Sequence, residues 1–283
     1  MSMRTTPRSH QAGFTLLEAV LVIVLTGIVA AMVAVFIRAP ITAYVDQARR
    51  GELSDAADTA LRRISRELQR ALPNSVRVDA TGKVLEFLPV SAGGRYRAAP
   101  DTGGGGNALD FDSAADSSFD VLGPAVDVAA GDQLVVYNVG LPGADAYSGE
   151  TRRSLTSTGS GLTTLSYAVG GTQFPFASPS NRFQVIGTPV TLLCTEGAAG
   201  TGSLRRYAGY PIQSTQPTSA GAAPLSTLSG ANNALLAPNV ESCSFGYSAG
   251  TSTRNAMLTL TLKLTSGGES VTLLHQVHLD NSP

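Results

Sequence analysis

The strongest pattern in the chain is an almost uninterrupted apolar run from Ala19 to Ile37, preceded by the hexapeptide GFTLLE at residues 13–18. Phe14 to Ile37 is 24 residues, so a helix over it would measure roughly 36 Å, enough to span a bilayer. One carboxylate, Glu18, lies near the start of this segment. A charge in hydrocarbon costs several kcal/mol unless it finds a partner, so Glu18 points to a function.

The helical pattern continues past the apolar run. Pro40 should kink or briefly interrupt the helix because proline has no backbone donor. Apolar residues then recur every three to five positions along one stripe. The stripe comprises Ile41, Tyr44, Val45, Ala48, Leu53, Ala57, Ala60, Leu61, Ile64, Leu68 and Leu72. Pro73 and Asn74 should end it, which predicts a helix from Phe14 to Leu72 whose second half must pack on something.

The remainder of the chain is rich in β signals. The expected strands are Ser75–Val78, Lys83–Pro89, Asp132–Asn138, Arg182–Ile186, Val190–Cys194, Ser203–Tyr210, Ser242–Tyr247, Ala256–Thr265 and Ser270–Asp280. The last two alternate apolar and polar residues and are joined by a short turn from Ser266 to Glu269, which predicts a hairpin. The amphipathic helix is the available cover for its apolar face. We therefore expect an α+β fold, a long N-terminal helix packed on an antiparallel β-sheet.

Four segments rich in Gly, Ser, Thr and Ala separate the expected strands. They are Ser91–Asp120, Gly140–Gly161, Glu196–Gly202 and Gln213–Gly230. We interpret them as long surface loops rather than linkers between domains, because no second core is visible. With 43% hydrophobic and 14% charged residues, the chain can bury a substantial core in one globular domain.

Cys194 and Cys243 are the only cysteines. Two thiols in an oxidising compartment would be expected to join, although two distant cysteines carry no connectivity information, and a pair of buried free thiols stays an alternative.

Charge gives no general reason to expect nucleic-acid binding. Without the first 13 residues, 18 basic residues face 21 acidic ones, a net charge of −3. Arg62, Arg66 and Arg70 form a basic ridge on the expected helix, which we interpret as a solvated face or a contact with an acidic neighbouring subunit.

Few motifs suggest an enzyme. A G-x-S-x-G match at 246–250 precedes a strand rather than the helix that a nucleophile elbow needs. His275 and His278 should point to opposite faces of one strand. Four aspartates between Asp110 and Asp120 could attract calcium, but the segment lacks the central glycine and the terminal glutamate of an EF-hand. The glycine run at 103–106 is not followed by the helix that a phosphate-binding loop requires. We expect no catalytic residue, no metal ion and no cofactor.

The basic leader, Gly13, Phe14 and Glu18 together resemble the prepilin signature of type IV pilins and type II secretion pseudopilins. The resemblance implies that a prepilin peptidase cuts after Gly13 and N-methylates Phe14. It also implies that Glu18 meets the terminal amine of a neighbouring subunit in a filament, neutralising both charges. A plain signal anchor is the alternative. Arg4 and Arg8, with no acidic residue among the first 13, favour a cytoplasmic N-terminus.

Further segments resemble the O-type minor pilins of mannose-sensitive haemagglutinin (MSHA) pilus biogenesis. They are residues 63–77, 85–89, 235–240 and 269–281. The chain is more distantly similar to W-type minor pilins and the J pseudopilin. The resemblance implies a minor pilin that helps initiate or cap pilus assembly, with major and minor pilins, prepilin peptidase and an inner-membrane platform as partners. A tip-located adhesive minor pilin and a type II secretion pseudopilin are the alternatives.

On this interpretation the chain has four parts. Residues 1–13 would be a cytoplasmic leader, 14–37 a transmembrane and filament-core helix, 38–72 its amphipathic continuation, and 73–283 a periplasmic β-rich domain. The mature protein would sit in the inner membrane as a single-pass protein and then in the pilus at the cell surface.

Overall fold

A computed structural model describes residues 13–250 and 255–280 of the chain, so 1–12 of the expected leader lie outside it. One long helix, α1, runs from Leu16 to Leu68 and continues through Pro40 without interruption. The chain divides into two compact units, residues 1–50 and 51–283. The expected α+β class is confirmed: one long apolar N-terminal helix is followed by antiparallel sheets.

The helix ends at Leu68, four residues earlier than expected. Its last turn tightens, because the amide of Arg70 donates to the carbonyl of Glu67 and the amide of Ala71 to that of Leu68. The amide of Leu72 then donates to the carbonyl of Leu88 at 2.7 Å, so this residue has already joined the β structure. The helix ends early because residues 70–72 pair with the chain from Leu88 to Val90, through the bridge between Ala71 and Pro89 and the bond from the amide of Val90 to the carbonyl of Arg70.

The larger sheet has seven strands in the order β1-β2-β11-β12-β13-β14-β15. Their bounds are β1 Arg77–Val78, β2 Val84–Phe87, β11 Val190–Thr195, β12 Gly202–Tyr207, β13 Asn233–Ser248, β14 Ala256–Ser266 and β15 Glu269–Leu279. Each expected strand in this sheet is present with shifted ends, and the turn from Ser266 to Glu269 closes the hairpin of β14 and β15 in continuous register.

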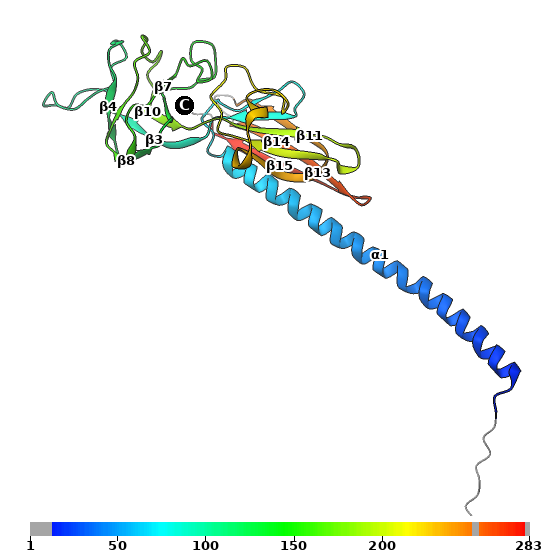
Figure 1. Ribbon diagram of the computed structural model, residues 1–283. Coiled ribbons are helices and arrows are strands. Elements are labelled where there is room, and N and C mark those ends of the chain that lie inside the picture. The colour runs from blue at the N-terminus through cyan, green and yellow to red at the C-terminus, as the bar shows by residue number, and fades with distance from the viewer. Residues whose placement is uncertain (1–12, 251–254, 281–283) are drawn as a thin grey trace, which may run out of the picture. The chain divides into compact units, whose positions relative to one another are not determined.

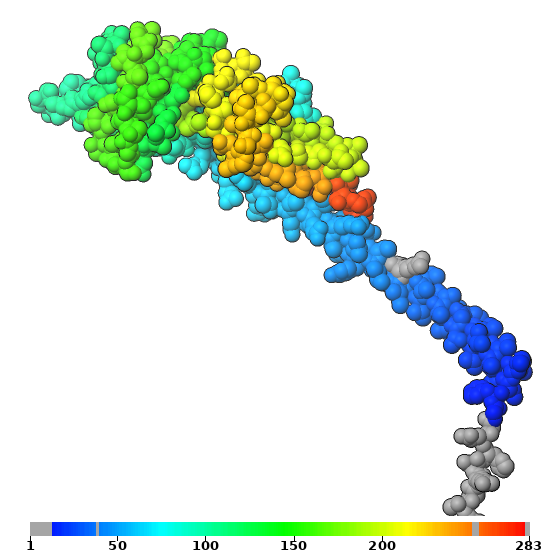
Figure 2. Space-filling view, viewed as in Figure 1, coloured from blue at the N-terminus to red at the C-terminus, as the bar shows by residue number. Residues whose placement is uncertain are grey.

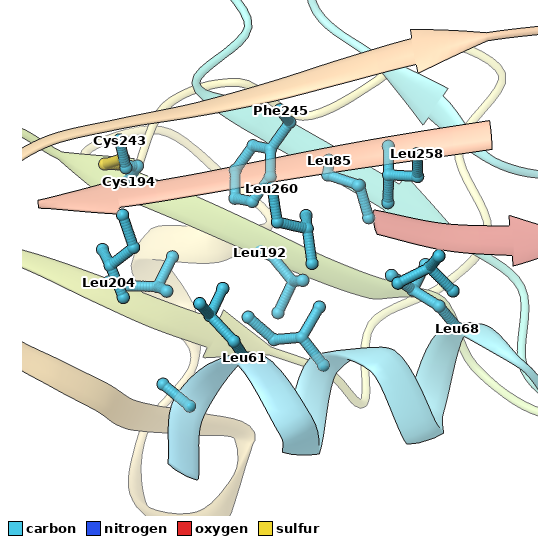
Figure 3. Close-up of a cluster of buried hydrophobic side chains, with 14 of the residues drawn as sticks. Leu61, Leu68, Leu85, Leu192, Cys194, Leu204, Cys243, Phe245, Leu258 and Leu260 are labelled. Carbon is cyan, nitrogen blue, oxygen red and sulfur yellow. A yellow bond between two sulfur atoms is a disulfide. The ribbon is translucent and has the colours of Figure 1, made fainter. Parts of the chain in front are cut away.

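The second half of α1 covers one face of this sheet, as expected. Six of its side chains are buried in a cluster with residues of the sheet: Leu53, Ala57, Ala60, Leu61, Ile64 and Leu68. Figure 3 shows Leu61 and Leu68 directed from the helix toward side chains of β2, β11, β12 and β14, and Figure 2 shows this part of the helix along the orange and red C-terminal strands. The stripe is buried only from Leu53 on, since Ile41, Tyr44 and Val45 are exposed.

The opposite face is partly covered by the segment between β12 and β13, which has only two 3-10 helices, Leu225–Thr227 and Gly230–Asn232. Leu225 is fully buried there in a cluster with Val84, Leu193, Tyr207 and Tyr210. The expected loop Gln213–Gly230 is therefore a loop that packs on the sheet. Glu196–Gly202 also remains a connection, with one 3-10 helix at Ala198–Gly200.

Two other expected loops are a wrong prediction, because they contribute strands to a second sheet with the order β7-β6-β10-β3-β4-β9. Its strands are β3 Val90–Tyr96, β4 Ser118–Leu122, β6 Gln133–Val135, β7 Arg152–Ser154, β9 Thr164–Ser166 and β10 Arg182–Ile186, and β5 Val126–Val128 pairs with β8 Gly159–Leu162. A separate hydrophobic cluster built around Tyr96, Phe119 and Phe183 stabilises this sheet. Figure 1 shows β3, β4, β7, β8 and β10 grouped apart from β11, β13, β14 and β15.

The second sheet is one continuous insertion between β2 and β11. These two strands are neighbours in the first sheet, where Phe87 pairs with Val190. The pairing continues past the junction, because the amide of Gly187 donates to the carbonyl of Pro89 and Ile186 pairs with Val90. Residues 90–186 thus leave and return at one point, and we call them the inserted sheet.

Candidate processing and assembly site

The expected processing site lies at the start of α1. Thr15 directly precedes the first helical residue, and its Oγ1 accepts a hydrogen bond from the amide of Glu18 at 3.3 Å. Thr15-Leu16-Leu17-Glu18 has the spacing of a capping box, in which a Thr at the N-cap satisfies an amide that has no partner in the helix. The carboxylate of Glu18 also lies in the first turn, where the helix dipole favours negative charge.

Gly13 and Phe14 precede the helix. Phe14 is 80% exposed. A Cβ built on Gly13 would meet nothing within 4 Å, so the packing of this chain does not require glycine at that position. A requirement for glycine there would have to come from another molecule.

Glu18 is the one charged residue between Leu16 and Ile37. Within the described part of the chain, its carboxylate has no ion-pair or hydrogen-bond partner. Thr26 carries a hydroxyl that would need a hydrogen-bond partner in a bilayer. This hydroxyl donates to the carbonyls of Val22 and Ile23 within its own helix. The surrounding side chains are apolar and exposed, and the segment is long and apolar enough to cross a membrane. No described residue of this chain therefore serves as a partner for the carboxylate of Glu18.

Cys194 and Cys243 form a disulfide in the structure, with their Cα atoms 6.5 Å apart. It joins β11 to β13, which β12 separates in the sheet order. Both residues are buried against the core under α1. Next to them, the carboxylate of Glu196 accepts hydrogen bonds from Lys83 Nζ and from the amide of Cys243, and these bonds lower the pKa of Glu196.

A buried polar cluster on the other face of the first sheet was not expected from the sequence. Glu86 on β2 is fully buried and accepts hydrogen bonds from Arg77 Nε at 2.7 Å and from the Tyr210 hydroxyl at 2.8 Å. Arg77 also donates to the carbonyls of Gln213 and Ser214 and lies 3.6 Å above the ring of Tyr147.

Burial raises the pKa of Glu86, and the charge of Arg77 opposes this effect. The pKa of Tyr210 is also raised, first by burial and then by the charge of Glu86. Arg77, Glu86 and Tyr210 bond to one another, and Arg77 also bonds to the segment after β12. The cluster therefore holds this segment against the sheet.

The remaining sequence candidates take structural positions. Ser248 pairs with Met257 at the end of β13, so it lies in a strand ladder, and residues 251–254 after it lie outside the described part. His275 is half-buried and His278 exposed. The amides of Gly103 and Gly105 donate to the carboxylate of Asp101, so these two amides are not directed at a bound phosphate group.

The aspartate loop is engaged in its own hydrogen bonds. The carboxylate of Asp116 accepts from the amide of Asp110, and Asp120 accepts from Arg97 Nε and the amide of Asn107. Among the residues that the structure describes, no three His, Cys, Asp or Glu side chains form a group suited to a metal ion.

Comparison with known families agrees with the geometry at the start of α1. The family model for the prokaryotic N-terminal methylation motif matches residues 8–34, which include Gly13, Phe14 and Glu18. The chain carries a type IV pilin-type signature. This signature supports a protein of the pilin or pseudopilin type, structural rather than catalytic, and anchored in a membrane. It also implies contacts with other pilins and with a prepilin peptidase in general. No curated protein and no solved structure matches the chain.

Proposed function

We propose that the chain is a minor pilin that helps to initiate or cap assembly of an MSHA-type pilus after cleavage by prepilin peptidase. The observation that carries the proposal is Glu18, a lone carboxylate in the first turn of a helix that is otherwise apolar to Ile37, with no partner among the residues that the structure describes. The methylation motif around it supports the same conclusion.

In this proposal the peptide bond after Gly13 is cut, and the new amine of Phe14 is methylated. Glu18 then pairs with the amine of a neighbouring subunit while the helices pack side by side. The basic residues Arg4 and Arg8 hold the leader in the cytoplasm, so the β domain is exported to the periplasm. The inner-membrane platform and a separate ATPase supply the work of assembly.

Three substitutions of Glu18 separate its two candidate roles. Glu18→Gln keeps the length and the capping capacity but removes the charge, whereas Glu18→Ala removes both and Glu18→Asp keeps the charge on a shorter side chain. If the charge pairs with a neighbouring amine, both Glu18→Gln and Glu18→Ala should insert and lose their leader normally but fail in assembly. A deletion strain complemented with each variant, with surface pili counted and leader cleavage followed by intact mass, tests this.

Normal pilus numbers with Glu18→Gln would show that Glu18 only caps the helix. Loss of membrane insertion in the same variant would also contradict the proposal, because removing a charge makes the segment more apolar. An intact mass that corresponds to a chain starting at Met1 would show that the leader is not cleaved and that the segment is a plain signal anchor.

A tip-located binding role is the second candidate, and the inserted sheet favours it. This sheet has its own core, and its chain leaves and returns at one point of the first sheet, as a module that presents a surface would do. Tyr147 also packs on Arg77 and donates to the carbonyl of Ser75. Deletion of the gene separates the two roles: a priming subunit predicts loss of pili, whereas an adhesive subunit predicts pili that no longer attach.

A further inference from the structure

A groove of about 450 Å³ lies where the first sheet meets the inserted sheet. The chain just after α1 forms one side, the paired strands β3 and β10 form another, and the end of β15 closes it. Its apolar lining includes Ala71, Val90 and Ala92, which are half-buried. None of the described residues that line it is aromatic.

Three arginines lie in or beside this groove, which Asp280 also lines, and we call them the arginine cluster. Arg70 and Arg182 line the groove, and Arg95 stands directly opposite Arg182 in the β3–β10 ladder. Like charges directly opposite one another destabilise a strand pair. Within the described part of the chain, no carboxylate forms an ion pair with any of the three, and Arg95 Nε donates only to the carbonyl of Ser180.

Other arginines of the inserted sheet are provided with partners. Arg97 pairs with Asp120, with Nε and Oδ2 3.3 Å apart. Arg152 donates to Gln133 and to the carbonyl of Ala146, and Arg153 donates to five backbone carbonyls. Among the five arginines of the inserted sheet, Arg182 is the one whose side chain has no hydrogen-bond or ion-pair partner in the described part of the chain, and it lines the groove together with Arg70.

We propose that the groove binds an acidic segment of a partner polypeptide. The carboxylates of this segment would pair with Arg70 and Arg182, beside which Arg95 adds a third positive charge. An apolar side chain of the segment would cover the half-buried apolar lining of the groove. Arginine suits this role because its planar fork binds carboxylates at two points. An acidic polysaccharide fits less well, because sugar rings pack on aromatic side chains and none lines the groove. The proposal does not depend on the role of Glu18.

The test is selection of peptides from a displayed library of random dodecapeptides against the full chain in detergent micelles. We expect enrichment of sequences that combine Asp or Glu with an apolar residue. A synthetic peptide of the selected consensus should then bind in fluorescence anisotropy, and its version with Asn and Gln should not. Arg70→Glu and Arg182→Glu should each weaken binding about tenfold or more, since a charged hydrogen bond is worth about 1.5–3 kcal/mol.

Arg66→Glu is the matched control. It reverses the same charge on an exposed side chain of α1 outside the groove, and it should leave binding unchanged. Arg182→Glu should also melt at or above the temperature of the wild type, because the new carboxylate faces Arg95 in place of a like charge. Weaker binding with undiminished stability is the signature that a merely structural arginine would not give.

Selection without acidic enrichment, or binding that survives both reversals, would overturn the proposal. So would loss of binding in Arg182→Glu together with a lower melting temperature, since unfolding would then explain it. Polygalacturonate or phosphatidylglycerol vesicles that bind more tightly than the consensus peptide, and through the same arginines, would assign the groove to a polysaccharide or a membrane instead.

Discussion

Removal of the disulfide between Cys194 and Cys243 should destabilise the β domain by a predictable amount. The two cysteines are 49 residues apart in sequence. In the chain-entropy treatment, a cross-link that closes a loop of this length stabilises the folded state by about 4 kcal/mol. Reduction of the wild-type protein isolates this effect because it changes no side-chain volume, whereas substitution of two buried cysteines also leaves cavities.

The assay is urea denaturation of the full chain in detergent micelles with and without a phosphine reductant. The chain has no Trp and 8 Tyr, so near-ultraviolet circular dichroism of tyrosine reports on the packed sheets. At about 2 kcal/mol per M, a loss of 4 kcal/mol lowers the midpoint by roughly 2 M. The double variant Cys194→Ala/Cys243→Ala should show a low midpoint that the reductant does not change.

Two results would refute this reasoning. Equal midpoints for oxidised and reduced wild type would show that the cross-link contributes nothing to stability. A non-reduced intact mass equal to that of the chain with both thiol hydrogens present would show that the two cysteines are free in the isolated protein. Free thiols are the alternative that the sequence left open.

Three further predictions concern the rest of the fold. Ile64→Ala should cost about 2–5 kcal/mol of unfolding free energy, because Ile64 is 1% exposed between α1 and the sheet, while exposed Thr59→Ala is the control in the same urea titration. The raised pKa of Glu86 means that its contribution to stability is present below its unfolded pKa of about 4.3 and is lost as the pH rises through the folded value. The stability of the wild type relative to Glu86→Gln should therefore fall from pH 4 upward, and a rise would contradict the assignment. Replacing residues 90–186 with a tight turn should leave the first sheet folded, with Leu72 and Leu88 made polar because they pack on Val135 and Ile186 of the insertion. The near-ultraviolet signal of the remaining tyrosines, Tyr44, Tyr207, Tyr210 and Tyr247, reports on this fold. Collapse of that signal would show that the inserted sheet is needed for folding.

The sequence predicted those elements whose pattern is local and long. The hairpin of β14 and β15 was found because eleven residues on each side alternate, and the helix because its stripe extends over many turns. In the inserted sheet, β6 and β10 were predicted, as Asp132–Asn138 and Arg182–Ile186. The other strands were missed because they are short or weakly patterned. For example, β7 reads RRS and β8 reads GSGL, so neither shows the alternation of a half-buried strand. Their conformation depends on pairing with strands distant in the sequence, β7 with β6 and β8 with β5.

The same distinction holds for the candidate sites. Gly13, Phe14 and Glu18 were proposed from the sequence because the signature is contiguous. The arginine cluster was not, because Arg70, Arg95 and Arg182 come together only when the insertion folds back on the end of α1. The cluster of Arg77, Glu86 and Tyr210 was not predicted either, because it forms only when β1 pairs with β2 and the segment after β12 packs on them.

The place of the insertion explains how a chain with a membrane helix can carry so large an addition. Because β2 and β11 are antiparallel neighbours, the inserted sheet replaces what would otherwise be a hairpin loop and breaks no ladder of the first sheet. The entropy cost of closing a longer loop grows only logarithmically with its length, and the inserted residues stabilise themselves through their own core. The helix and the first sheet therefore remain available for assembly, while the inserted sheet and the groove at its base are free to acquire a binding role.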